Sequence, residues 1–156
     1  MNELLDQLIF VAGQHAELIM TKLHMPLMPT WVYITDEGAC IAGTPWQDEV
    51  EKKVMAMELR RAMLAEGAKA YSMVTEVWAS AAPEGWNPET DDPIRASEQA
   101  NRQEYVLCFA TDGDETRWKR WEIKRDHLER VTALKEEDWN PGDKAHSWLT
   151  KLLRKQ

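Results

Sequence analysis

The chain has 156 residues, a formal net charge of -8 and two cysteines, and it fits a single domain spanning residues 1–156. The negative charge repels phosphate backbones and disfavours nucleic-acid binding, and charged residues interrupt the first apolar run, so we expect neither a signal peptide nor a membrane span. Cys40 and Cys108 lack the spacing of a metal site or a disulfide framework, so we expect reduced thiols in the core and no metal. Without a signal peptide or a membrane span, we expect a cytoplasmic location, and we expect no cofactor.

The first predicted element is a helix that begins after Asn2, its N-cap, and runs to about His24. Its apolar residues recur at intervals of three and four: Leu4, Leu5, Leu8, Ile9, Val11, Ala12, Ala16, Ile19 and Leu23. His15 lies on this side and could be a ligand or a titrating switch. A packed histidine is the favoured interpretation, because no chelating residue stands four positions away.

Residues 31–35 and 39–42 are predicted to form a hairpin, and a second helix is expected to begin with Thr44 as N-cap and to end at Gly67. This helix carries two apolar rows. The row predicted to face the sheet contains Trp46, Val50, Val54, Met57 and Leu64. The other row, Met55, Leu59 and Met63, is predicted to face the first helix or a second subunit, and it motivates the expectation of a homodimer.

Residues 71–81 form the predicted central strand, because this stretch is long, nearly uncharged and alternates its side chains. Its single charge, Glu76, lies among apolar neighbours and requires a specific partner. We expect Arg95 or Arg102 to neutralise it. In the alternative interpretation, Glu76 lies at the floor of a pocket with a raised pKa or a bound cation.

The connection over residues 83–102 is long, acidic and rich in proline. Such a segment is either a functional lid or binding loop, or simply a mobile connection. Trp86 favours contact with a partner, because an aromatic residue in a polar loop contributes little to folding.

Residues 104–111 and 117–125 are predicted to form a hairpin around Asp112 and Gly113. The second strand is the only basic stretch, with Arg117, Lys119, Arg120, Lys124 and Arg125 alternating with Trp118 and Trp121. This pattern could bind a nucleic-acid strand, but the solvated face of an edge strand, neutralised by the acidic connection, is the favoured interpretation. The region from residue 126 to 139 is ambiguous, and residues 141–155 are predicted to form a C-terminal helix.

The motif Glu76-Val77-Trp78 on a strand, followed by Arg102-Gln103-Glu104, resembles a group of small uncharacterised proteins from bacterial and phage genomes. The resemblance covers the middle half of the chain. It implies a bacterial or phage origin and no known activity.

These patterns predict a two-layer α+β fold, with an antiparallel sheet of four to five strands packed against helices in the order α-β-β-α-β-β-β-α. We expect a non-enzymatic binding protein with a protein or small-molecule partner, which in a phage setting would act on a host component. The predicted binding residues are Trp86, Arg95, Arg102, Trp118 and Trp121. The alternatives are a small hydrolase that uses Glu76, Glu104 and His127, and a nucleic-acid-binding protein that uses the basic strand 117–125.

Overall fold

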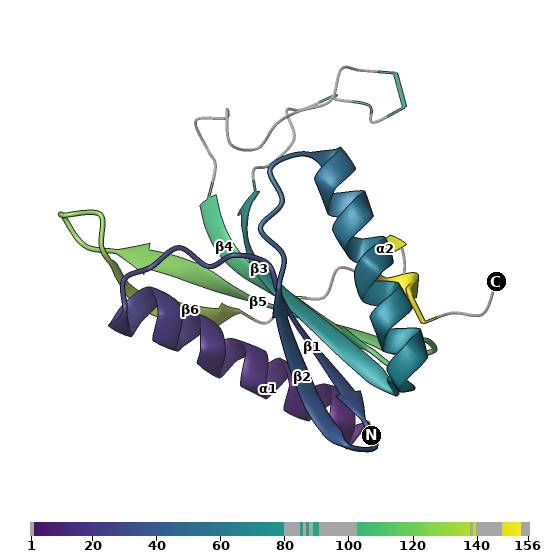
Figure 1. The fold of residues 1–156 in the computed structure, drawn as a ribbon. Coiled ribbons are helices and arrows are strands. Elements are labelled where there is room, and N and C mark those ends of the chain that lie inside the picture. Colours follow the sequence, from purple (N-terminus) through teal and green to yellow (C-terminus); the bar gives the residue numbers. More distant parts are fainter. Residues whose placement is uncertain are drawn as a thin grey trace.

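The middle layer of the protein is a six-stranded antiparallel sheet in the order β2-β1-β3-β4-β5-β6 (Figure 1). The computed structural model describes residues 2–79, 85, 87, 89–90, 103–137, 139 and 148–153. The strands are β1 (Thr30–Thr35), β2 (Gly38–Gly43), β3 (Ala70–Ala79), β4 (Gln103–Thr111), β5 (Thr116–Arg125) and β6 (Val131–Glu137). The helical elements are α1 (Glu3–Glu17), its π-helical continuation η1 (Leu18–Lys22), α2 (Glu49–Glu66) and the 3-10 turn η3 (Trp148–Lys151).

The α+β class is confirmed, and the prediction of four or five strands is wrong. The sixth strand, β6, lies in the region that the sequence left ambiguous, and it pairs with β5 from Arg120 to Arg125. The basic strand pairs with β4 from Thr116 to Glu122 and with β6 from Arg120 to Arg125, so it is not an edge strand. Of the predicted C-terminal helix, the described part contains the turn η3, and the remainder lies outside the described residues.

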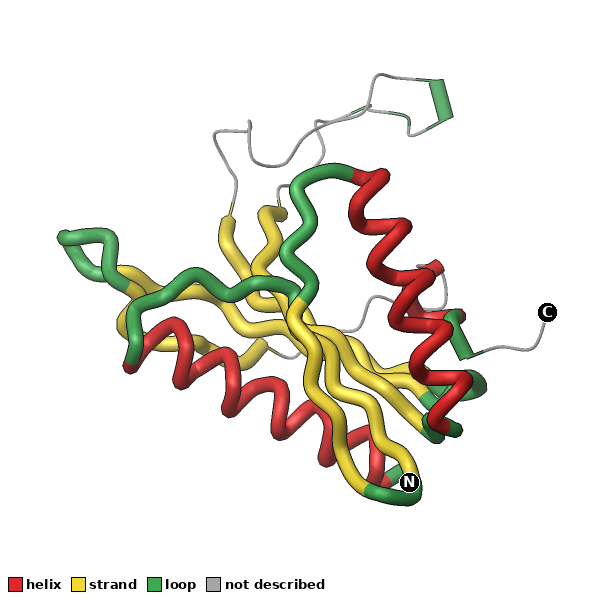
Figure 2. Tube along the Cα trace, in the orientation of Figure 1, coloured by secondary structure: helices red, strands yellow, loops and turns green. Residues whose placement is uncertain are grey.

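The sheet is covered on both faces, so the protein has three layers rather than the expected two. Helix α1 lies against one face, and α2 with η3 lies against the other (Figure 2). Residues on the α1 face include Val74, Val106 and Cys108, whereas Tyr71 and Phe109 point to the α2 face. Because the central strands are apolar on both sides, each face requires its own cover.

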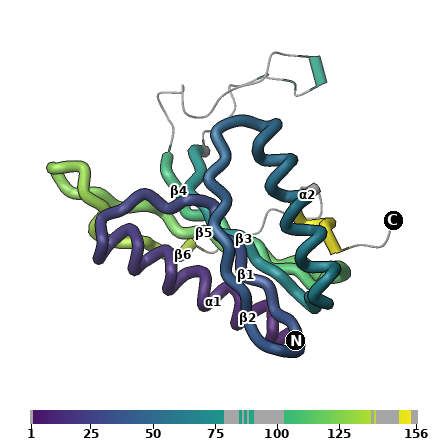
Figure 3. Tube along the Cα trace, viewed as in Figure 1, coloured from purple at the N-terminus to yellow at the C-terminus, as the bar shows by residue number. Residues whose placement is uncertain are grey.

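Strands β3 to β6 follow one another along the chain as a meander, whereas α2 carries the chain from the edge strand β2 back to β3 (Figure 3). Strand β3 pairs with β1 on one side and with β4 on the other. The predicted central strand is thus confirmed in the interior of the sheet.

The N-terminal helix begins as predicted, because the side chain of Asn2 accepts a hydrogen bond from the Leu5 N–H at 3.4 Å. Its buried residues are Leu5, Leu8, Ile9, Ala12 and Ala16. The π-helical turn extends it to Lys22, and the helical segment ends at His24, which has a φ of 50°. Neither helix in the described part of the chain combines the length and the apolarity that a membrane crossing requires.

Helix α2 begins four residues later than predicted. Asp48 is its N-cap, and its carboxylate accepts a hydrogen bond from the Glu51 N–H at 2.7 Å. The hydroxyl of Thr44, the predicted cap, instead accepts a hydrogen bond from the buried Trp31 indole N–H at 2.8 Å. The predicted end is confirmed, since Gly67 closes the helix in the left-handed conformation with a φ of 71°.

The assignment of the two apolar rows of α2 is wrong. Leu59 and Met63 pack on the sheet together with Ala56, whereas Val50 and Val54 are exposed. Arg61 explains the difference, because it falls within the row of Val50 and Val54, and a charged side chain is almost never fully buried without a partner. Helix α1 cannot cover either row, since it lies on the opposite face of the sheet (Figure 1).

Candidate functional site

A groove of about 1440 Å³ lies between α1 and the strands β5 and β6. It is larger than a second cavity, at the other end of the α1 face, that is described below. Helix α1 lines it with Asp6, Gln7, Ile9, Phe10, Val11, Gly13, Gln14 and Glu17, and the sheet side with Thr116, Arg117, Trp118, Lys119, Trp121, Leu134, Glu136, Glu137 and Trp139.

The floor of the groove depends on a close approach between Gly13 and Trp121. A Cβ atom at position 13 would lie only 2.8 Å from Cζ2 of the Trp121 indole. The absence of a side chain in the middle of α1 therefore lets the indole lie directly against the helix backbone. Trp121 is only 9% exposed, so this predicted binding residue forms the floor of the site rather than a projecting contact.

Two large apolar residues stand on the helical wall without cover from the sheet. Phe10 is 66% exposed and Val11 is 46% exposed, although the neighbouring Ile9 is buried. Exposed apolar side chains beside a groove are typical of a surface that binds a partner. Sequence reasoning missed Phe10, and the available signal was that this large apolar residue falls outside the periodic row of α1.

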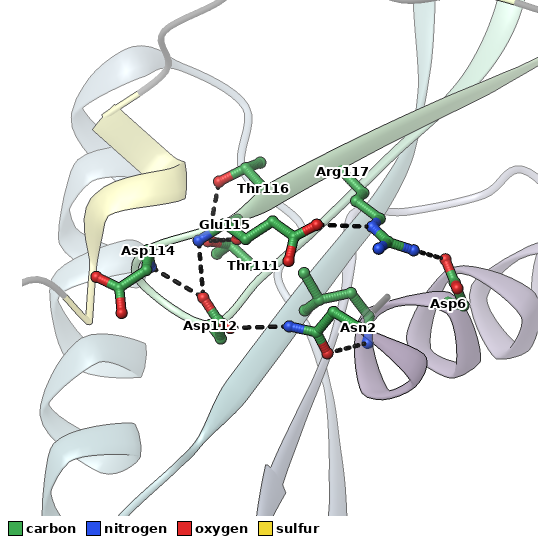
Figure 4. A network of polar contacts seen from close by, with 9 residues as sticks. Asn2, Asp6, Thr111, Asp112, Asp114, Glu115, Thr116 and Arg117 are labelled. Carbon is green, nitrogen blue, oxygen red and sulfur yellow. Dashed lines mark hydrogen bonds and ion pairs between the residues drawn. The ribbon is translucent and has the colours of Figure 1, made fainter.

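A polar network holds the N-terminus of α1 to the turn between β4 and β5 and forms one end of the groove (Figure 4). The Asn2 side-chain amide donates to the Asp112 carboxylate at 2.9 Å, and the Glu115 N–H donates to the same carboxylate at 2.8 Å. These hydrogen bonds, the one from the Glu115 backbone above all, hold the pKa of Asp112 below its usual range. Arg117 bridges Asp6 of the helix and Glu115 of the turn, and Asp6 raises the pKa of this guanidinium.

The basic residues of β5 are each paired with a carboxylate of the described residues. Lys119 lies 2.7 Å from Glu136, and Arg120 lies 2.7 Å from Glu137, both on β6. The neutralising acids of these two residues thus come from the adjacent strand. The acidic connection 83–102, which the sequence suggested would neutralise the basic strand, lies largely outside the described residues.

The two tryptophans of β5 lie on opposite faces of the sheet. Trp118 packs against Phe109 and Trp139 on the α2 face, and Trp121 packs in the core under α1. The bases of one nucleic-acid strand cannot stack on both side chains at once. The arrangement therefore offers no continuous stacking platform along this strand.

A second cavity, of about 260 Å³, lies at the other end of the α1 face and is lined by Glu76 and Arg125. The Leu27 N–H donates a hydrogen bond to the Glu76 carboxylate at 3.1 Å. Arg125 donates two hydrogen bonds to Glu104, at 2.7 and 3.1 Å, and a third to the Glu129 carbonyl oxygen at 2.6 Å. Glu104 raises the pKa of this guanidinium.

Of the three hydrolase candidates, the structure brings Glu76 and Glu104 to one face of adjacent strands, and Arg125 donates to Glu104. His127 is exposed in the turn between β5 and β6 and does not line the cavity. Within the described ranges, no group of three or more His, Cys, Asp and Glu side chains is arranged to hold a metal ion. Trp86, Arg95 and Arg102, and with them the predicted arginine partners of Glu76, lie outside the described residues.

Comparison with known proteins assigns no relative: no protein-family model matches this chain, and neither a curated protein nor a solved structure shows significant similarity to it.

Proposed function

We propose that this protein acts by binding, without catalysis, a polypeptide segment in the groove between α1 and the strands β5 and β6. The volume of the groove, about 1440 Å³, carries the proposal. Sites for small molecules occupy about 300 to about 1000 Å³, so a longer ligand matches this groove better than a metabolite does. The exposed side chains of Phe10 and Val11 supply apolar contacts along its wall.

The charges of the groove indicate the chemistry of the partner. The residues that line the groove carry a net negative charge, with four acids, Asp6, Glu17, Glu136 and Glu137, and two bases, Arg117 and Lys119. Three of these acids are paired: Asp6 with Arg117, Glu136 with Lys119, and Glu137 with Arg120. The whole chain is also acidic, with a formal net charge of -8. A segment with apolar side chains between basic residues complements both features, because long-range attraction steers its approach and the apolar wall retains it.

The proposed setting of this binding is the cytoplasm. Cys40 and Cys108 are both free thiols, which is the usual state in a reducing compartment. A bacterial or phage origin, and with it a partner from a host cell, remains the expectation that the E-x-W and R-x-E motifs imply.

Two synthetic peptides test the proposal. Both carry leucines at alternating positions, with lysines between them in one peptide and glutamates in the other, and fluorescence anisotropy of a labelled peptide measures binding. We expect the lysine peptide to bind and the glutamate peptide to remain free. The double substitution Phe10→Ser and Val11→Ser should weaken binding about tenfold, because it removes two apolar contacts.

The control is Ile41→Ser on β2, at the opposite edge of the sheet. Ile41 is 67% exposed, nearly the same as Phe10, so this variant removes an equally accessible apolar side chain far from the groove. Its affinity for the lysine peptide should equal that of the wild type. If the two groove substitutions leave affinity unchanged, binding is due to overall charge and the groove is not the site.

A further inference from the structure

The outer face of α2 presents an apolar row that the fold leaves uncovered. Its members are Val50, Val54, Met57 and Leu64, spaced four, three and seven residues apart. Val50 is 73% exposed and the other three are exposed as well. The inner face, by contrast, buries Leu59 to 8% exposure against the sheet. The outer row thus forms a stripe along one side of the helix, interrupted by Arg61 between Met57 and Leu64.

Charged residues flank this stripe, with one sign on each side. At 100° per residue, Glu51 and Glu58 fall on one flank, and Lys53 and Arg60 fall on the other. In coiled-coil terms, the stripe occupies the a and d positions, the two acids occupy e positions and the two bases occupy g positions. The charges on the two flanks of such a helix therefore complement the charges on the flanks of an identical helix.

We propose that the outer stripe of α2 binds the same stripe of a second copy of this chain, with the two helices parallel. Parallel helices bring each g position next to the e position of the following heptad, so Lys53 meets Glu58 of the second copy, and Glu58 meets Lys53 of the second copy. Antiparallel helices centred on Met57 would instead place Glu58 near Glu58 and Lys53 near Arg60 of the second copy. Charge complementarity therefore selects both the occupant and its direction.

Arg61 lies within the stripe and limits the affinity of the pair. In the parallel arrangement it faces Arg61 of the second copy, and like charges at this position oppose association. Its guanidinium lies 3.5 Å from the Glu58 carboxylate, which offsets part of this repulsion. The stripe is four turns long, so the contact is small and belongs to the weak, transient class.

The pairing leaves the groove free. Helix α2 covers the face of the sheet opposite to α1, so a dimer through α2 carries two grooves that point away from the shared helices (Figure 1). This inference does not depend on what the groove binds. It adds a second surface, and it makes the assembly bivalent.

Sedimentation equilibrium at concentrations from about 1 µM to about 1 mM tests the inference. Wild-type protein should show a mass that rises with concentration toward that of a dimer. Lys53→Glu and Glu58→Lys should each weaken association about tenfold, because each places like charges across the interface. The double variant with both substitutions should restore association, since the charge pair is then re-formed with exchanged signs.

Two further variants make the outcome decisive. Arg61→Leu should strengthen association at least tenfold, because it removes the repulsive layer and completes the apolar stripe. Ile41→Lys, on the outer edge strand β2, should leave association unchanged and so excludes pairing through that edge. All substituted residues are exposed, and circular dichroism checks that each variant is folded.

A monomeric mass for both the wild type and Arg61→Leu at the highest concentration would overturn the inference. Stronger association of Lys53→Glu would overturn it too, because the new glutamate would then be meeting Arg60 in an antiparallel pair. Failure of the double variant to recover would show that the two residues do not meet.

Discussion

At the scale of single residues, Gly13 determines how closely α1 approaches the sheet. Gly13→Ala should lower the free energy of unfolding by about 1 kcal/mol, although alanine in a helix interior ordinarily raises it by about that amount. The new Cβ would lie 2.8 Å from the Trp121 ring, and forcing extra volume into packed groups costs about 1 to 3 kcal/mol. Urea titration measures the change.

Gln14→Ala is the matched control for this prediction. Gln14 is the next residue of α1 and is exposed, so its substitution should change the stability by less than about 0.5 kcal/mol. An increase in stability for Gly13→Ala would mean that the indole moves aside freely. The floor of the groove would then be adaptable rather than rigid.

Asp112 gives the network at the end of the groove a pH dependence with a definite sign. Its pKa in the folded protein lies below the value of about 3.9 for an unfolded chain, so its contribution to stability is fully present above about pH 4. The contribution is lost as the pH falls through the folded pKa. We expect Asp112→Asn to lose about 1 kcal/mol at neutral pH, since the site is partly open to solvent.

Urea titrations of wild type and Asp112→Asn at several pH values measure this dependence. The difference in unfolding free energy should be constant from neutral pH down to about pH 5 and should close below about pH 4. Asp114→Asn, in the same turn but exposed, should show a smaller difference at neutral pH. If the difference in unfolding free energy between wild type and Asp112→Asn stays constant down to about pH 3, the ionised carboxylate of Asp112 does not contribute to stability.

At the scale of the elements, two substitutions near the start of α2 separate the effect of helix capping from the effect of a buried hydrogen bond. Asp48→Ala should cost about 1 kcal/mol, because the helix loses a hydrogen bond to an otherwise unpaired N–H. Thr44→Ala should cost about 1 to 3 kcal/mol for another reason, since the Trp31 indole N–H is then buried without its acceptor.

Far-UV circular dichroism and urea titration separate the two effects. Asp48→Ala should reduce the helical signal slightly as the first turn frays, whereas Thr44→Ala should reduce the stability without a change in that signal. If Thr44→Ala loses helical signal and Asp48→Ala does not, Thr44 is the N-cap of α2, as the sequence predicted.

Most elements could be predicted from the sequence, because their signals are local. Asn2 and Gly67 mark helix ends by their own chemistry, and the alternation in residues 71–81 reports a buried strand directly. The position of α2 on the sheet could not be predicted in this way. Both of its sides are apolar, and Arg61 on the outer side disfavours the burial of that side.

The sixth strand and the groove were missed for a related reason. Strand β6 is mostly polar, because it lies at the edge of the sheet and faces solvent along much of its length, so it lacks the apolar pattern of the inner strands. The groove depends on residues about 110 positions apart, Gly13 and Trp121, and no local pattern connects them. Glu76 was recognised as a charge in need of a partner, yet its described donor is the backbone of Leu27, which carries no sequence signal.

At the scale of the whole molecule, the three layers predict opposite results for two neighbouring positions of α2. Leu59→Asp should unfold the protein, because a charge would enter the core between the helix and the sheet at a cost of several kcal/mol. Met57→Asp, two residues away on the outer face, should leave the melting temperature of the monomer nearly unchanged.

Thermal melting at a low protein concentration, where the proposed dimer is dissociated, measures both variants. The contrast depends only on which side of the helix faces the sheet. A folded Leu59→Asp with an unfolded Met57→Asp would reverse the orientation of α2 and remove the basis of the dimer.

The edge strand β2 has a consequence for how this protein behaves in concentrated or heated solution. Its sequence, from Gly38 to Gly43, contains no charge and no proline, and among the described residues no strand covers its outer side. Such an edge can recruit identical strands from other molecules and promote aggregation, and natural proteins usually block it with lysine or proline. Ile41→Lys should therefore slow the growth of light scattering on heating without lowering the melting temperature, whereas equal scattering in both proteins would indicate that aggregation begins at another surface.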